Sequence, residues 1–150
     1  MLGSTPLASV SIAAGKFLIS IPTAPVAVTE TVGRPASDVS MGNWLPSAGP
    51  SLYGMINEVV ADAATYIHTE SLGTCEIALN ATVSPGTSLS YRASSSMGNG
   101  LTVRLLVDGV AIATWAHGLT TTDDLYTRAL SPAQTAKMAT GVVTVQLTST

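Results

Sequence analysis

Hydrophobic and polar residues alternate along much of the second half of the chain, with the period of a half-buried β-strand. From Thr74 onward, Cys75, Ile77 and Leu79 alternate with polar or small neighbours, and the same period returns over residues 88–93. The segments between them contain the turn-forming residues glycine, proline and serine. This pattern predicts a series of short strands, each with one face in a protein core.

The C-terminal third adds a hairpin, a short helix and further strands. Residues 101–107 and 110–116 flank Asp108-Gly109, a dipeptide typical of a two-residue β-hairpin turn. Ser131-Pro132 has the order of an N-cap and a first helical residue, and the helix is expected to end near Ala139, before Gly141. Strands are expected over 125–130 and 142–148. These elements predict an all-β protein, an antiparallel β-sandwich of jelly-roll type with one or two short helical turns.

Residues 39–70 connect this strand-rich region to the N-terminal part of the chain. Residues 42–50 contain glycine, proline and asparagine around a single tryptophan, which predicts turns. Ser51 is placed to cap a short helix that runs to about Asn57. A short strand is expected over 65–67.

The first 38 residues predict an extended N-terminal arm, and residues 39–150 the β-sandwich domain. Four prolines in this arm disfavour a long helix or a central strand, and Lys16 is the only charged residue between Met1 and Thr29. An arm on a partner protein is slightly favoured over an arm that lies on its own domain as an edge strand. The arm residues predicted to bind a partner are apolar: Val10, Ile12, Phe17, Leu18, Ile19 and Ile21.

Composition excludes several classes of function. Charged residues make up 10% of the chain, the net charge is −3, and 37 residues are serine or threonine. Six basic residues provide no electrostatic surface for nucleic acid. The apolar runs are too short to span a membrane, and no positive charge precedes the first of them as in a signal peptide, so maturation inside the producing cell is expected. Soluble monomers normally carry more charge than this. A chain with so few charged residues is therefore expected to self-associate as a dimer or trimer.

No set of residues predicts catalysis, a metal site or a cofactor site. His68 and His117 are far apart in the sequence, and each is expected to be a structural hydrogen-bonding group. Asp123 and Asp124 could form a calcium site with Asp108, but no calcium-loop motif accompanies them, so solvated loops are favoured. Cys75, the single cysteine, is expected to be buried and unreactive. The chain is therefore predicted not to be an enzyme and to bind no cofactor.

The aromatic residues allow two interpretations. They could form a platform that stacks on sugar rings, or they could lie in the core and in subunit contacts. If Ile112 points inward, strict alternation turns Trp115 outward, which makes Trp115 a candidate exposed contact. The residues concerned are Trp44, Tyr53, Tyr66, Tyr91, Trp115 and Tyr126.

Several short motifs resemble small structural proteins of tailed bacteriophages over residues 34–148. They begin with Arg34-Pro35-Ala36-Ser37-Asp38, Trp44-x-Pro46 and Leu52-Tyr53-x-x-Ile56. Tyr91-Arg92 at a strand end and Leu130-Ser131-Pro132-Ala133-Gln134 before the last strand continue the resemblance. It implies a place in the virion rather than a chemical activity.

Together these features predict a head decoration or cement protein of a phage virion. It would be assembled in the host cytoplasm, lie on the capsid surface, and bind the major capsid protein and other virion proteins. The alternative is a tail- or fibre-associated module that binds host glycans.

Overall fold

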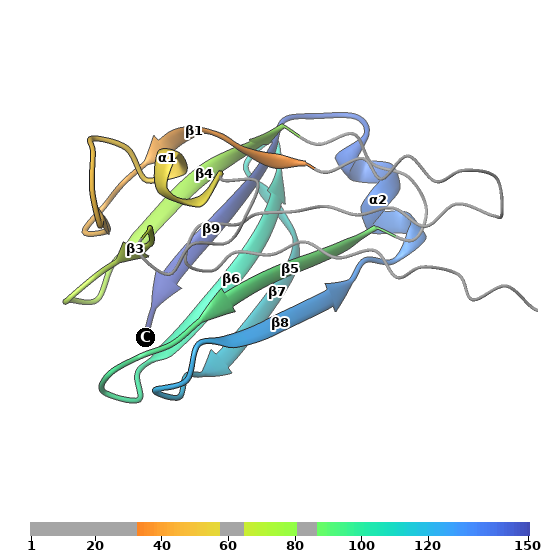
Figure 1. Ribbon diagram of the computed structural model, residues 1–150. Coiled ribbons are helices and arrows are strands. Elements are labelled where there is room, and N and C mark those ends of the chain that lie inside the picture. Colours follow the sequence, from red (N-terminus) through yellow and green to blue (C-terminus); the bar gives the residue numbers. More distant parts are fainter. Residues whose placement is uncertain (1–32, 58–64, 81–86) are drawn as a thin grey trace, which may run out of the picture.

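A computed structural model describes residues 33–57, 65–80 and 87–150, which are mostly β-structure (Figure 1). All strand pairs in this part of the chain are antiparallel. The expected all-β class is therefore confirmed. The elements in chain order are β1 (Arg34–Ser40), β2 (Leu45–Pro46), α1 (Tyr53–Ile56), β3 (Ile67–His68), β4 (Thr74–Asn80), β5 (Ser88–Ala93), β6 (Gly100–Val107), β7 (Val110–Gly118), β8 (Asp124–Ala129), α2 (Pro132–Met138) and β9 (Val143–Ser149).

A five-stranded sheet in the order β1-β4-β9-β6-β7 carries most of the core. The last strand, β9, lies between β4 and β6, so the C-terminal residues are central to the sheet. The predicted alternation in β4 is confirmed, because Cys75, Ile77 and Leu79 are buried. They pack with Val103 and Val145 of the neighbouring strands in one hydrophobic cluster.

Two smaller ribbons, β2-β3 and β5-β8, complete the described β-structure. The β5-β8 ribbon lies beside the five-stranded sheet (Figure 1), and its Leu89 and Tyr91 join the same core cluster. Tyr91 is paired with Tyr126 across the ribbon, and their rings stack with centroids 5.5 Å apart. Ser88 and Ser90 are buried too, so both faces of β5 are covered over residues 88–91 and the one-sided burial expected for this strand is not seen.

The predicted Asp108-Gly109 hairpin turn is confirmed. Both residues have positive φ, 49° for Asp108 and 77° for Gly109, as a type I′ turn requires. The Asp108 carboxylate also accepts a hydrogen bond from the backbone N–H of Val142 at 2.9 Å. This contact ties the β6-β7 turn to the start of β9.

The predicted N-cap of α2 is also confirmed, and α2 is anchored to β7. Ser131 and Gln134 form a capping box, in which each side chain binds the backbone N–H of the other residue. The Gln134 side-chain amide donates to the carbonyl oxygen of Ile112 at 2.9 Å. Ile112 lies at a register shift, where Leu105 and Leu106 pair with Ala113 and Ala111. Gln134 therefore satisfies a carbonyl group at a β-bulge.

This bulge corrects the expectation for Trp115. The extra residue breaks the strict alternation between Ile112 and Trp115, so both side chains pack against the core. Trp115 is opposite the buried Val103 and is itself half-buried. It is not the exposed contact residue that uninterrupted alternation predicts.

The N-terminal boundary of the domain also differs from expectation. Residues 34–38, assigned to the arm from the sequence, belong to β1, an edge strand of the five-stranded sheet. An edge position tolerates Pro35, since a proline lacks the N–H that a central strand would use. The predicted partner-binding residues, Val10 through Ile21, lie outside the described residues.

The predicted first helix is present but begins one residue later than expected, and a different residue caps it. Its N-cap position is Leu52, and no side chain at that position provides a cap. Instead the Asp38 carboxylate of β1 accepts hydrogen bonds from the backbone N–H groups of Leu52 at 2.9 Å and Tyr53 at 2.7 Å. The expected cap from Ser51 is wrong, because Asp38 supplies both acceptor oxygens from a neighbouring strand.

Candidate functional site

A cleft of about 800 Å³ opens at the end of the sheet where the chain terminates. One wall is β3 with the residues on either side of it, and the opposite wall is the connection from β5 to β6. In Figure 1 these segments lie on either side of the C-terminal end of β9. The volume of the cleft lies within the range of small-molecule binding sites.

The β3 wall presents an aromatic ring to solvent. Tyr66 is 45% exposed, and its ring lies next to that of His68, with centroids 5.5 Å apart. The backbone of Tyr66 is held on both sides, because its N–H donates to Ser47 Oγ at 3.0 Å and its carbonyl accepts from Ser47 N at 2.8 Å. Nδ1 of His68 is buried and has no hydrogen-bond partner among the described residues.

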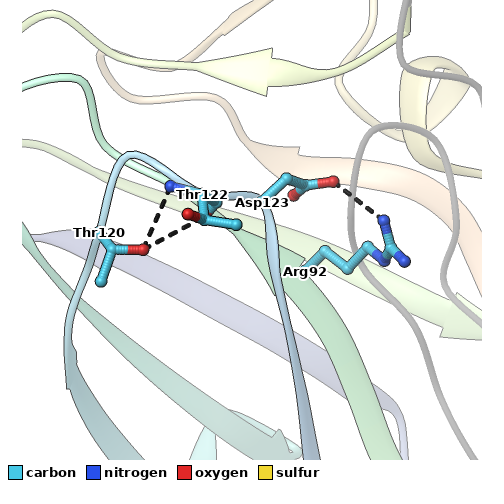
Figure 2. Close-up of polar contacts among 4 residues, drawn as sticks. All are labelled: Arg92, Thr120, Thr122 and Asp123. Carbon is cyan, nitrogen blue, oxygen red and sulfur yellow. Dashed lines mark hydrogen bonds and ion pairs between the residues drawn. The ribbon is translucent and has the colours of Figure 1, made fainter.

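The opposite wall carries an ion pair between two chain segments. Arg92, in β5, donates to the Asp123 carboxylate at 3.2 Å, and Figure 2 shows the two side chains pointing toward each other. Both side chains are 43% exposed. The loop before β8 is shaped by Thr120, whose hydroxyl oxygen accepts a hydrogen bond from Thr122 N at 3.2 Å (Figure 2). Ser95 N donates to Thr120 O at 2.8 Å, which joins this loop to the β5-β6 connection.

The floor of the cleft is apolar and continuous with the core. Trp44 is nearly buried there, and its indole N–H donates to the carbonyl oxygen of Gly73 at 3.2 Å. Leu101 and Leu147, from β6 and β9, complete the floor with Tyr91. The cleft is therefore a preformed apolar hollow with polar groups at its rim.

Behind Tyr91 lies a buried polar network. The Tyr91 hydroxyl is hydrogen-bonded to Nε2 of His117, and the Arg128 guanidinium lies 3.0 Å from Nδ1 of the same ring. Because a guanidinium only donates, Nδ1 must accept, and the ring proton is on Nε2. Burial lowers the pKa of His117, and the charge of Arg128 lowers it further. Burial raises the pKa of Tyr91 to about 12, although Arg128 opposes that shift. Both side chains are thus neutral near pH 7.

The lowered pKa of His117 predicts a stability that decreases in mild acid. The unfolded chain takes up a proton near pH 6.5, whereas burial and the charge of Arg128 disfavour protonation of His117 in the folded state. The contribution of neutral His117 to the free energy of unfolding is therefore fully present above about pH 6.5. It is lost as the pH falls through the lower pKa of the folded state. Urea unfolding between pH 7.5 and pH 5 measures this change. His117→Gln, which has no titrating ring, is the control, and an equal pH dependence in both proteins would contradict the assignment.

The remaining chemical candidates do not converge on one site. Asp108 lies in the turn before β7, at the opposite end of that strand from Asp123 and Asp124. Asp123 binds Arg92, and Asp124 accepts from Thr120 at 2.8 Å. Among the described residues, no group of three or more histidine, cysteine, aspartate or glutamate side chains could hold a metal ion.

Cys75 is fully buried, as expected. Burial raises the pKa of its thiol to about 12, and a backbone hydrogen bond from Leu147 only partly offsets this. The thiol therefore stays protonated near neutral pH.

The aromatic residues do not form a single platform. Tyr91 stacks on Tyr126 and meets His117 edge-on, and Trp115 packs on the core. Tyr66 alone is exposed among the aromatic residues that line the cleft. No motif along the chain points to this cleft, because its walls come from segments that are distant in sequence.

No family model, curated protein or solved structure matches this chain. Neither helix in the described part of the chain has the length and apolar character of a membrane-spanning segment. Any proposal about the function of this chain therefore rests on its residues and their geometry.

Proposed function

We propose that this chain is a virion structural protein of a tailed phage, most simply a head decoration or cement protein. It would bind and stabilise the major capsid shell from the outside. The observation that carries this proposal is the junction at Arg34. Nearly uncharged, apolar residues lead directly into β1, an edge strand of the five-stranded sheet. An arm that begins at a sheet edge is well placed to reach a neighbouring subunit.

The finer architecture in this proposal is a β-sandwich of jelly-roll type. The five-stranded sheet would be one layer, and the β5-β8 ribbon would belong to the other. Their shared core, which includes Leu89 and Val103, supports this layering. Jelly rolls occur in viral capsid proteins and in lectins, so the architecture suits both functions considered for this chain.

In this mechanism, the arm adds affinity and the domain fills a gap between capsid subunits. Apolar side chains such as Phe17, Ile19 and Ile21 would enter pockets of a capsid subunit or of a second copy of this chain. Backbone hydrogen bonds would extend a partner sheet by one strand. Self-association as a dimer or trimer would place several arms on one local symmetry axis.

Removal of residues 1–32 tests this mechanism, since β1 begins only at Arg34. The shortened protein is expected to keep its β-sheet circular-dichroism spectrum and to lose binding to capsids in a co-sedimentation assay. A full-length variant with Phe17→Ser and Ile19→Ser is expected to bind much more weakly, whereas Lys16→Ala is expected to bind normally. Unchanged decoration of capsids by the shortened protein would refute the role of the arm.

A second candidate function is the binding of host glycans by a tail- or fibre-associated module. The observation that favours it is the cleft, with an exposed Tyr66 and the Arg92–Asp123 pair at its rim. Cryo-electron microscopy of intact particles distinguishes the two locations. Density on the head surface supports the cement function, and density confined to the tail supports the glycan-binding function.

A further inference from the structure

We propose that the cleft between β3 and the β5-β6 connection binds an uncharged carbohydrate, with Tyr66 as the stacking residue and the Arg92–Asp123 pair as the polar anchor. This site rests on the second proposed function, glycan binding, and assigns it to residues other than Trp115. It needs no role of the N-terminal arm, so it holds whether the protein lies on the head or on the tail.

The aromatic group of the site is Tyr66. One face of a sugar ring is lined by C–H groups, and such faces pack on aromatic rings. A tyrosine adds a polar hydroxyl group at the edge of its ring. Tyr66 is 45% exposed and lines the cleft, whereas Tyr91 and Trp44 are buried in its floor. Two hydrogen bonds with Ser47 hold the backbone of Tyr66, and its ring lies against that of His68. A ring on an anchored backbone loses less conformational entropy when a ligand stacks on it.

The polar anchor lies on the opposite wall. A guanidinium carries five N–H donors, and Asp123 accepts from one of them in this pair. The carboxylate has several lone pairs, so the pair offers donors and acceptors side by side. Adjacent hydroxyl groups of a sugar have the same alternation of donor and acceptor. Ser94, Ser95 and Asn99, along the same connection, add further polar groups to the wall.

The charges of the cleft favour an uncharged ligand. The positive charge of Arg92 is neutralised by Asp123, and the other carboxylate of the lining, Glu70, is exposed. A sialic acid, a uronic acid or a phosphate group would meet no excess of positive charge there, and it would be repelled by Glu70. Neutral hexoses and N-acetylhexosamines meet neither problem.

The test uses the full-length protein on an array of neutral oligosaccharides that end in glucose, galactose or N-acetylglucosamine, together with sialylated counterparts. Binding to neutral glycans is expected, and calorimetry with the best one provides the affinity. Tyr66→Ala is expected to weaken this affinity about tenfold or more, as for a central aromatic contact. Tyr66→Phe is expected to retain it, because the ring remains. Arg92→Ala is expected to weaken it as well.

Two control substitutions separate the site from the rest of the surface. Leu125→Ala changes an exposed residue of β8 that does not line the cleft, and Trp115→Phe keeps an aromatic ring against the core in β7. Both are expected to bind as the unsubstituted protein does. Glycan binding that survives Tyr66→Ala and Arg92→Ala would overturn the site but leave the glycan function intact. Preference for sialylated glycans would overturn the ligand class, and no binding to any glycan would overturn both the site and that function.

Discussion

Replacement of Gly42 by alanine is expected to lower the free energy of unfolding by about 3 kcal/mol, from positive-φ strain together with a steric clash. Gly42 has φ of +53° in the turn between β1 and β2, where Trp44 N donates to Met41 O at 3.0 Å. A Cβ atom at this position would overlap the carbonyl oxygen of Thr74, which is backbone of β4. The turn therefore cannot accept a side chain unless β1 and β4 move apart.

Gly98→Ala is the matched control for this prediction. Gly98 has φ of +72°, but a Cβ atom there would meet no other atom within 4 Å. Its substitution is expected to cost about 1 kcal/mol, from backbone strain alone. Urea unfolding of both variants measures the difference. If Gly42→Ala is no more destabilising than Gly98→Ala, the close approach of the Thr74 backbone has no energetic consequence and the prediction fails.

Replacement of Asp38 by alanine is expected to cost about 2 kcal/mol of stability, since hydrogen bonds to a charged group are worth more than neutral ones. The substitution leaves the N–H groups of Leu52 and Tyr53 without their acceptor. Leu52 and Ile56 are fully buried around this point, so a displaced α1 would disturb the core. Thermal unfolding is expected to show the loss as a lower Tm.

Ser51→Ala distinguishes the two caps. Sequence analysis predicts Ser51 as the capping residue, whereas the structure assigns that role to Asp38. Ser51→Ala is thus expected to change stability by less than about 0.5 kcal/mol, and Asp38→Asn, which keeps one acceptor oxygen, by an intermediate amount. A larger loss from Ser51→Ala than from Asp38→Ala would show that the serine caps the helix.

The two candidate functions depend on different parts of the molecule. As proposed, capsid decoration would use residues before β1, and carbohydrate binding would use the cleft at the end of β9. Truncation of the arm and substitution of Tyr66 therefore report on them separately. A decoration protein with an intact cleft could present that cleft to the host surface, so the two functions are compatible in one virion protein.

Features that depend on neighbouring residues were predictable from the sequence. The Asp108-Gly109 turn follows from the backbone preferences of two residues, and the α2 cap follows from Ser131, Pro132 and Gln134 within one helical turn. The burial of Cys75, Ile77 and Leu79 follows from strand periodicity. These predictions hold because the interactions that decide them span only a few residues of chain.

Features that depend on contacts between distant segments were decided only by the tertiary structure. The bulge at Ile112, which turns Trp115 inward, is bound by Gln134 of α2. The acceptor for the start of α1 comes from Asp38 in β1. The cleft joins β3, the β5-β6 connection and the end of β9. The local sequence determined where strands and turns form, and packing between strands far apart in the chain determined which side chains face solvent, because burial depends on what lies opposite each residue.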